Sequence, residues 1–215
     1  MAADVSVEAS TIVFLVLSSV LAFYLTRNYL AERKRNYLYW SAGMWIFALS
    51  DLLEVLFAFG VYSQAMAQFY LFVTALLVIP LAMGSLELIK SRLAKNAYLG
   101  YSLVAAAALA YVTFTSQVSN FVTDSVVNGN APVNVIILSS FITFPALIII
   151  VAIAALSYMR TKRKKVIWII LGMLTFAFGG ILYVASFPAS IYYTEFAGLV
   201  MLWLGFFDFS MLKRR

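Results

Sequence analysis

The sequence predicts an all-α polytopic membrane protein with seven transmembrane helices. The composition is 64% hydrophobic and only 11% charged, and the apolar runs are long, continuous and separated by clusters of basic residues. A soluble domain of this size could not bury so much apolar surface. Backbone groups in lipid need internal hydrogen-bond partners, and continuous rather than alternating apolar runs favour helices over a β-barrel.

Seven apolar segments each have about the 20 residues that a helix needs to cross a ~30 Å hydrocarbon core. Their approximate bounds are 9–28, 37–60, 65–89, 97–117, 133–158, 166–187 and 190–211. We expect residues 1–215 to form a single transmembrane domain. Asp4 and Glu8 precede the first segment and no basic residue does, so this segment reads as a retained span rather than a cleaved signal peptide.

The basic residues predict the orientation of these spans. All 15 Lys and Arg residues fall after the first, third, fifth and seventh segments. The clusters are Arg27/Arg33/Lys34/Arg35, Lys90/Arg92/Lys95, Arg160/Lys162/Arg163/Lys164/Lys165 and Lys213/Arg214/Arg215. Since cytoplasmic loops are enriched in Lys and Arg, we expect a multi-pass plasma-membrane protein in contact with lipid, with its N-terminus outside and its C-terminus inside. The same rule explains the high pI, and no nucleic-acid partner is expected.

A faint internal repeat suggests that the chain is built from two halves. Gly43–Val55 aligns with Gly172–Val184 with 6 identities in 13 positions, and the stretch from Tyr70 aligns loosely with the stretch from Tyr193. This pattern predicts two parallel three-helix halves, 9–89 and 133–211, joined by a linker helix at 97–117. Chance matching of apolar sequence is the alternative.

Two prolines lie within the predicted spans, and Gly172 is among the glycines that do. Pro80 and Pro145 each remove a helix hydrogen bond, so we expect both to kink their helices. The simple explanation of such kinks is that they shape the helices and have no further function. Gly172 should let a neighbouring helix backbone approach closely.

Five of the nine acidic residues lie within or at the ends of spans: Asp51, Glu54, Glu87, Glu195 and Asp208. Embedded carboxyl groups without cationic partners are costly and are candidates for function. Near the inner ends of their spans, Glu87 and Asp208 have simple explanations as ion pairs with Lys90 and with the last basic cluster.

The remaining three acids predict a pocket in the outer half of the membrane. At about 1.5 Å per residue, Asp51 and Glu54 lie roughly 21 and 25 Å from the inner end of their span, and Glu195 lies about 8 Å below its outer end. Thr74, Tyr183 and Tyr193 reach the same depth. These six residues predict a site for a small-molecule ligand, a proton or a cation; a hydrogen-bonded packing network is the alternative reading.

Several chemistries are excluded or disfavoured. The chain has no Cys and no His, which removes disulfides, His-ligated haem and His-based metal sites, and we expect no cofactor. A retinal pigment needs a Schiff-base lysine in the last span, and none occurs there before Lys213. Asp51 and Asp208 lie at opposite depths, unlike the pair of an intramembrane aspartyl protease. No phosphate-binding loop or serine nucleophile motif is present, so we expect no catalytic residues and no enzyme.

Local motifs resemble the seven-helix regions at the N-termini of prokaryotic sensor histidine kinases. Arg27 to Arg35 leading into Tyr39-Trp40 and then Glu54 is similar to their second helix, and the stretch around Pro80 resembles their third helix and that of microbial rhodopsins. The resemblance covers about residues 10–95 and implies a membrane sensor fold with an outer-half pocket. The chain holds no kinase domain after its last span, so a signal would pass to a partner protein.

Three functions are consistent with these features. The first is a non-enzymatic sensor or receptor-like module, with the basic loop Arg160, Lys162, Arg163, Lys164 and Lys165 facing a cytoplasmic or membrane protein partner. The second is a small solute carrier coupled to a proton or cation. Its 3+1+3 plan resembles SWEET-type sugar carriers, although their paired prolines are missing here. The third is an accessory subunit of a larger membrane complex.

Overall fold

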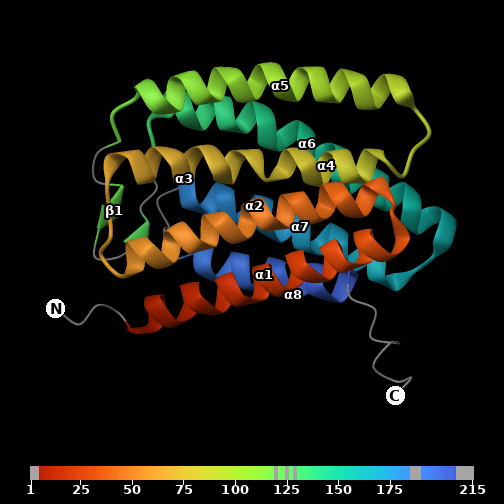
Figure 1. The fold of residues 1–215 in the computed structure, drawn as a ribbon, viewed down its shortest axis with the longest axis horizontal. Helices are drawn as coiled ribbons and strands as arrows, with labels where there is room; N and C mark the ends of the chain where they lie inside the picture. The colour runs from red at the N-terminus through yellow and green to blue at the C-terminus, as the bar shows by residue number, and fades with distance from the viewer. Residues whose placement is uncertain (1–4, 119–120, 124–125, 128–129, 185–189, 207–215) are drawn as a thin grey trace.

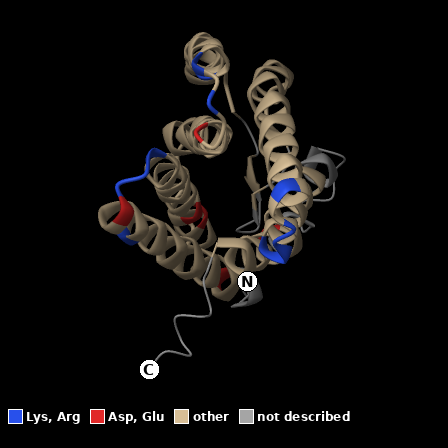
Figure 2. Ribbon diagram, turned by 90° about the vertical axis from the view of Figure 1, so that its right-hand side faces the viewer, with Lys and Arg blue, Asp and Glu red and all other residues tan. Residues whose placement is uncertain are grey.

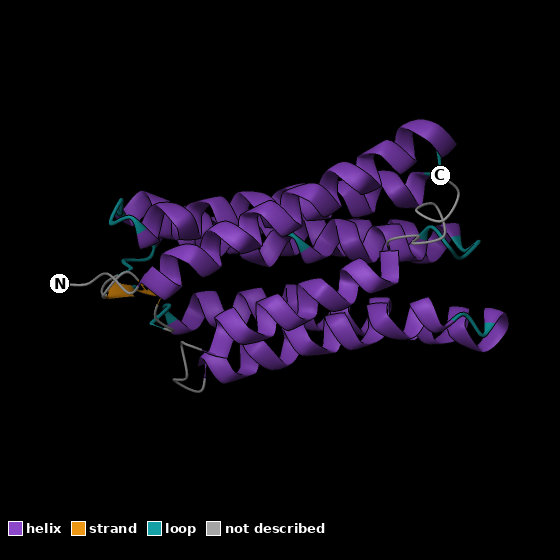
Figure 3. Ribbon diagram, turned by 90° about the horizontal axis from the view of Figure 1, so that it is seen from below, coloured by secondary structure: helices purple, strands orange, loops and turns teal. Residues whose placement is uncertain are grey.

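The structure is a computed structural model that describes residues 5–118, 121–123, 126–127, 130–184 and 190–206. In this part of the chain it is a bundle of long helices with one small pair of strands (Figures 1 and 3). The elements are α1 (Val5–Glu32), α2 (Arg35–Ala58), α3 (Gln64–Leu76), α4 (Val78–Leu86), α5 (Arg92–Thr115), β1 (Val122–Thr123), β2 (Val126–Val127), α6 (Val133–Thr161), α7 (Lys164–Val184) and α8 (Ser190–Phe206). Because α4 continues α3 along one axis, the eight helices of the described residues form seven helical rods.

The helical class and the apolar character of the helices are confirmed. Within the described residues, 5 helices are long and apolar enough to cross a membrane. They are Glu8–Glu32, Arg35–Ala58, Gln64–Leu86, Arg92–Thr115 and Val133–Thr161. The described part of α8 from Tyr193 to Phe206 forms a shorter apolar helix.

The boundaries of the third rod follow from its sequence. Ser63 caps the start of α3 by accepting a hydrogen bond from the Met66 amide at 3.2 Å. Leu77 separates α3 from α4, and Pro80 lies one turn later. Proline has no N–H to donate to the carbonyl four residues earlier, so the helix is weakened where it breaks. In α6, by contrast, the helix runs through Pro145 without interruption.

Six of the rods form a closed ring. Contacts run from α1 to α2, on to α3 and α4, then to α6, α7 and α8, and back to α1. Trp203 on α8 closes the ring by donating from Nε1 to the Leu17 carbonyl on α1 at 3.1 Å. The seventh rod, α5, lies outside the ring against α3, α4 and α6 (Figure 1).

The two ends of the bundle differ in charge. The described Lys and Arg residues gather where α1 meets α2, α4 meets α5 and α6 meets α7, and these junctions lie at the same end (Figures 1 and 2). The opposite end carries the two short strands, which pair with Val122 against Val127. The segment between α5 and α6 is therefore partly folded, because Phe121 and Val127 are buried against Phe57 and Tyr70.

The turn between the first two helices of each half recurs with the same geometry. Arg33 and Lys162, 129 positions apart, have left-handed backbones with φ of 54° and 53°. The amide of each donates to the carbonyl of a tyrosine four residues earlier, Tyr29 or Tyr158, at 2.7 Å. The α1–α2 and α6–α7 turns thus share one geometry.

Close helix contacts recur in the same way. A Cβ on Gly43 would lie 3.1 Å from the Leu77 carbonyl oxygen, and one on Gly172 would lie 3.0 Å from the Gly198 carbonyl oxygen. A Cβ on Gly84 would lie 2.3 Å from Trp40 Cδ1. One on Gly205 would lie 2.4 Å from Ile169 Cγ1. In each pair the residue on α7 follows its counterpart on α2 by 129 positions, and the residue on α8 follows its counterpart in the third rod, Leu77 or Gly84, by 121.

Candidate functional site

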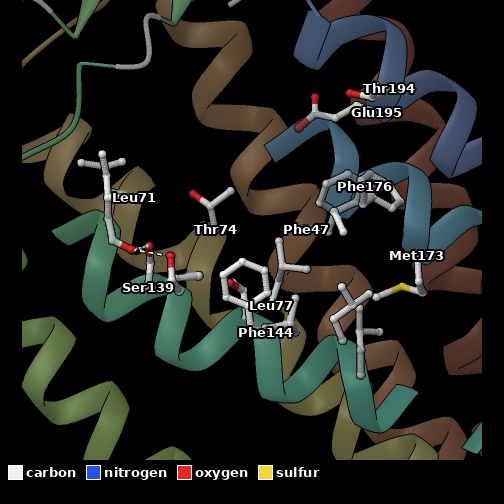
Figure 4. Close-up of a pocket in the computed structure, with 18 of the residues that line it drawn as sticks. Phe47, Leu71, Thr74, Leu77, Ser139, Phe144, Met173, Phe176, Thr194 and Glu195 are labelled. Carbon is white, nitrogen blue, oxygen red and sulfur yellow. Dashed lines mark hydrogen bonds between the residues drawn. The ribbon is translucent and has the colours of Figure 1, made fainter. Parts of the chain in front are cut away.

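A cavity of about 470 Å³ lies inside the ring of helices. We call it the central cavity; side chains from α2, α3, α4, α6, α7 and α8 line it, and Figure 4 shows most of them. Its floor is formed by Met44, Leu81, Met173 and Leu202, which belong to the main hydrophobic core. Its other end reaches Ala131 beside the strand-bearing end of the bundle. The volume is in the range of small-molecule sites.

The walls of the central cavity are mainly apolar. Phe47 on α2 and Phe176 on α7 meet edge to face with ring centroids 5.5 Å apart, so they join the two sides of the ring at the level of the cavity. Both rings line the space that Glu195 and Thr74 also face (Figure 4). A ligand here would bury an apolar body against aromatic and aliphatic side chains.

Several hydroxyl groups that line the cavity already donate their hydrogen atoms to backbone carbonyls. Ser139 and Ser140 donate to the Ile136 carbonyl at 2.9 and 2.7 Å, and Thr74 donates to the Tyr70 carbonyl. Such bonds satisfy the donor of each hydroxyl and leave its lone pairs as acceptors. The hydroxyls therefore present acceptor atoms to the cavity.

Glu195 supplies the carboxyl group of the cavity wall. It projects from α8, is only 8% exposed and lies beside Thr194 (Figure 4). Its Oε2 atom is buried and has no hydrogen-bond partner among the described residues. A buried acceptor without a partner carries a desolvation cost, which a ligand able to donate a hydrogen bond would relieve.

Asp51 and Glu54 lie behind the wall rather than in it. Both are almost fully buried on α2, with 1% and 3% exposure. Asp51 accepts a hydrogen bond of 2.5 Å from Ser18 on α1, and Glu54 accepts one from the Tyr70 hydroxyl on α3. The second oxygen of each, Oδ1 and Oε2, has no partner in the described part of the chain.

The three acids form one electrostatic group, which we call the acidic cluster: Asp51, Glu54 and Glu195. Asp51 interacts electrostatically with Glu54, and Glu195 interacts with both. Among the described residues, the ion pairs lie elsewhere, between Lys34 and Glu32 and between Lys95 and Glu87. The acidic cluster therefore places three carboxyl groups on one side of the cavity, and no salt bridge among the described residues involves them.

The other residues of the predicted pocket lie in different places. Thr74 lines the cavity. Tyr193 lies on the outer surface with 78% exposure and is not a lining residue. The side chain of Tyr183 falls outside the described residues.

Only some of the charged residues predicted near the basic end lie in the described part of the chain. Asp208 and the last basic cluster fall outside the described residues. Glu87 pairs with Lys95 at 2.7 Å, so the expected pairing with Lys90 is replaced by one across the α4–α5 turn. The basic loop from Arg160 to Lys165 is exposed.

Two partners of the acidic cluster were missed by sequence reasoning. Ser18 and Tyr70 hold Asp51 and Glu54, yet they come from neighbouring helices whose contacts no spacing rule predicts. Gln68, on the same helix as Tyr70, donates to the Ser116 carbonyl at 2.8 Å and links α3 to the end of α5.

The described residues contain no group of three His, Cys, Asp or Glu side chains placed to hold a metal ion. What the arrangement can do is bind a small molecule through an apolar wall and a polarised acidic side. No protein-family model matches the chain, and a search of curated proteins and of solved structures finds no match either.

Proposed function

We propose that this chain is a receptor-like plasma-membrane protein that binds a small, largely apolar molecule in its central cavity. The observation that carries the proposal is Glu195: a buried carboxyl group with an unpartnered oxygen in the wall of a cavity of about 470 Å³. Buried polar groups that serve packing alone normally have a hydrogen-bond partner. A ligand entering from the strand-bearing end would complete this site.

The proposed orientation places the N-terminus outside and the basic end inside. Its support is the gathering of the described Lys and Arg residues at one end of the bundle (Figure 2), since positive charge favours the cytoplasmic side. In this orientation the basic loop Arg160, Lys162, Arg163, Lys164 and Lys165 faces the cytoplasm. We propose it as the contact for a partner protein that receives the signal.

Single cysteines will test the orientation, because the natural chain has none. Val61→Cys, at an exposed position, should react with a membrane-impermeant maleimide added to intact cells. Lys34→Cys and Arg163→Cys should react only after permeabilisation. A permeant maleimide, which should label all three variants, is the control. The reverse pattern would invert the orientation.

Binding in the central cavity can be blocked by filling it. Thr143 lines the cavity from α6, so Thr143→Phe should abolish saturable binding of small aromatic probes, measured by calorimetry with protein in lipid nanodiscs. The matched control is Ile137→Phe, on the same helix at a position with 51% exposure, which should bind as the unmodified protein does. Equal binding by both variants would place the ligand elsewhere.

A carrier is the second candidate, and the recurring geometry favours it. Two halves with the same turn at Arg33 and Lys162 and the same close glycine contacts surround one cavity, and parallel repeats around a central site are a transporter architecture. Here residues 9–89 and 133–211 would move against each other, and the acidic cluster would carry a proton or cation. Counterflow of a permanently charged probe into proteoliposomes, with Glu54→Gln for comparison, separates a carrier from a receptor.

A further inference from the structure

We infer that the central cavity selects small organic amines, molecules that carry a protonated amino group on an apolar body. The inference rests on the proposed binding function and names its ligand class. It comes from three properties of the same walls: their hydrogen-bonding character, their charge and their aromatic surface.

The cavity offers hydrogen-bond acceptors in excess of donors. The hydroxyls of Thr74, Ser139 and Ser140 donate to carbonyls of their own helices, and the Tyr70 hydroxyl donates to Glu54. Among the described lining residues, none is Lys, Arg, Asn, Gln or Trp. Because an amino group supplies only donors in its protonated form, it is complementary to this surface, whereas a carboxylate ligand would face further acceptors.

The carboxyl groups in and behind the wall point to the same class. Glu195 lines the space, its buried Oε2 atom has no hydrogen-bond partner among the described residues, and Asp51 and Glu54 add their electrostatic influence from behind the wall. A cation in the cavity would form with Glu195 the ion pair that the described side chains do not provide. Charge-assisted hydrogen bonds of this kind are about twice as strong as neutral ones.

The aromatic surface accommodates the rest of such a molecule. Phe47 and Phe176 line the cavity in edge-to-face contact, and the faces of aromatic rings attract ammonium groups as well as apolar carbon. Figure 4 shows Thr194 and Glu195 on one side of the space and Thr74 and Ser139 on the other. An amine therefore has a carboxyl group for its head and acceptor hydroxyls across the cavity.

A bare metal ion fits these walls less well. Ca²⁺ takes six to eight oxygen ligands, whereas the cavity is lined mainly by Met, Leu, Phe, Val and Ala. No group of three acidic, His or Cys side chains in the described part of the chain is placed to hold a metal. The cavity volume, about 470 Å³, is also far larger than an ion requires.

Three probes with one body and different heads will test the inference. They are 4-phenylbutylamine, 4-phenylbutan-1-ol and 4-phenylbutanoate, titrated into the protein in lipid nanodiscs, with empty discs subtracted. We expect the amine to bind at least about tenfold more tightly than the alcohol, because only the amine pairs with the acid, and we expect the anion not to bind. Glu195→Gln keeps the size of the side chain and removes its charge, so it should bring amine and alcohol to similar affinity.

The outcomes separate this inference from the function on which it rests. Equal affinity of amine and alcohol, or tighter binding of the anion, would overturn the amine class while leaving a ligand-binding cavity. Absence of binding by all three probes would overturn both. Should Glu195→Gln fail to fold, Ser140→Ala serves instead: it removes one acceptor from the wall and should weaken the amine more than the alcohol.

Discussion

Replacement of Gly84 by alanine will lower the free energy of unfolding by about 2 kcal/mol or more, the cost of overpacking a close contact. The new Cβ would lie 2.3 Å from Trp40 Cδ1, 2.6 Å from Trp40 Nε1 and 3.0 Å from the Asn36 carbonyl oxygen. The indole cannot simply move away, because it is flanked by Tyr37 and Phe206 at ring-centroid distances of 5.9 and 5.1 Å. Helices α2 and α4 would have to separate.

The matched control for this substitution is Gly100→Ala in α5. A Cβ at Gly100 would meet nothing within 4 Å, and alanine is favoured over glycine within a helix by up to about 1 kcal/mol. Unfolding of both variants in detergent micelles, followed by circular dichroism during titration with sodium dodecyl sulfate, gives the comparison. If Gly84→Ala were as stable as Gly100→Ala, the close approach of α2 to α4 would be wrong.

Replacement of Tyr70 by phenylalanine will destabilise the protein by roughly 1–3 kcal/mol, the cost of leaving a buried polar group without its partner. The Tyr70 hydroxyl donates to Glu54 Oε1, and the other oxygen, Oε2, already lacks a partner in the described part of the chain. The variant would leave the buried carboxyl group without its observed donor. Tyr111→Phe, at a position with 73% exposure, should change stability by no more than about 0.5 kcal/mol.

A double-mutant cycle will show whether the two residues act together. Glu54→Met removes the buried carboxyl group with little change in volume. Combined with Tyr70→Phe, it should cost less than the sum of the single substitutions by about 1–2 kcal/mol, as expected for residues in direct contact. Additive effects would mean that Tyr70 does not hold Glu54.

Sequence patterns predicted the helices well because membrane spans depend on local composition. Runs of apolar residues with basic ends correspond to the rods, and Gly172 makes the close contact that its small size predicts. The same rule could not foresee β1 and β2, since Phe121 and Val127 are buried by residues of α2 and α3. Their burial is a tertiary effect.

The sequence predicted the depth of the candidate site along the helices but not which of its side chains line the cavity. A fixed rise per residue places Asp51, Glu54 and Glu195 at one level, and the structure gives them one electrostatic group. Which acid lines the cavity depends on the rotation of each helix. Contacts between neighbouring rods decide that rotation, so only Glu195 faces the space while α1 and α3 cover the other two.

Sequence alignment was an equally limited guide to the register between the third rods of the two halves. The sequence paired Tyr70 with Tyr193, a spacing of 123, whereas the contacts of Gly84 and Gly205 give 121. Two tyrosines in apolar sequence are a weak guide to register. A backbone carbonyl so close to a glycine that no side chain would fit is a stronger guide. Close glycine contacts therefore carry information about register that residue identity does not.

The recurring turns and glycine contacts have a consequence for the ancestry of the protein. They are what tandem duplication of a three-helix gene would leave, with α5 inserted outside the ring to keep both copies in the same orientation. In the register set by the glycines, Glu195 is the counterpart of Thr74, and both line the cavity. A homodimer of the founding three-helix unit would have had a cavity with two equivalent sides. Differences such as this one would make the two sides unlike, and a molecule able to enter a symmetric cavity in either of two senses would then be held in one.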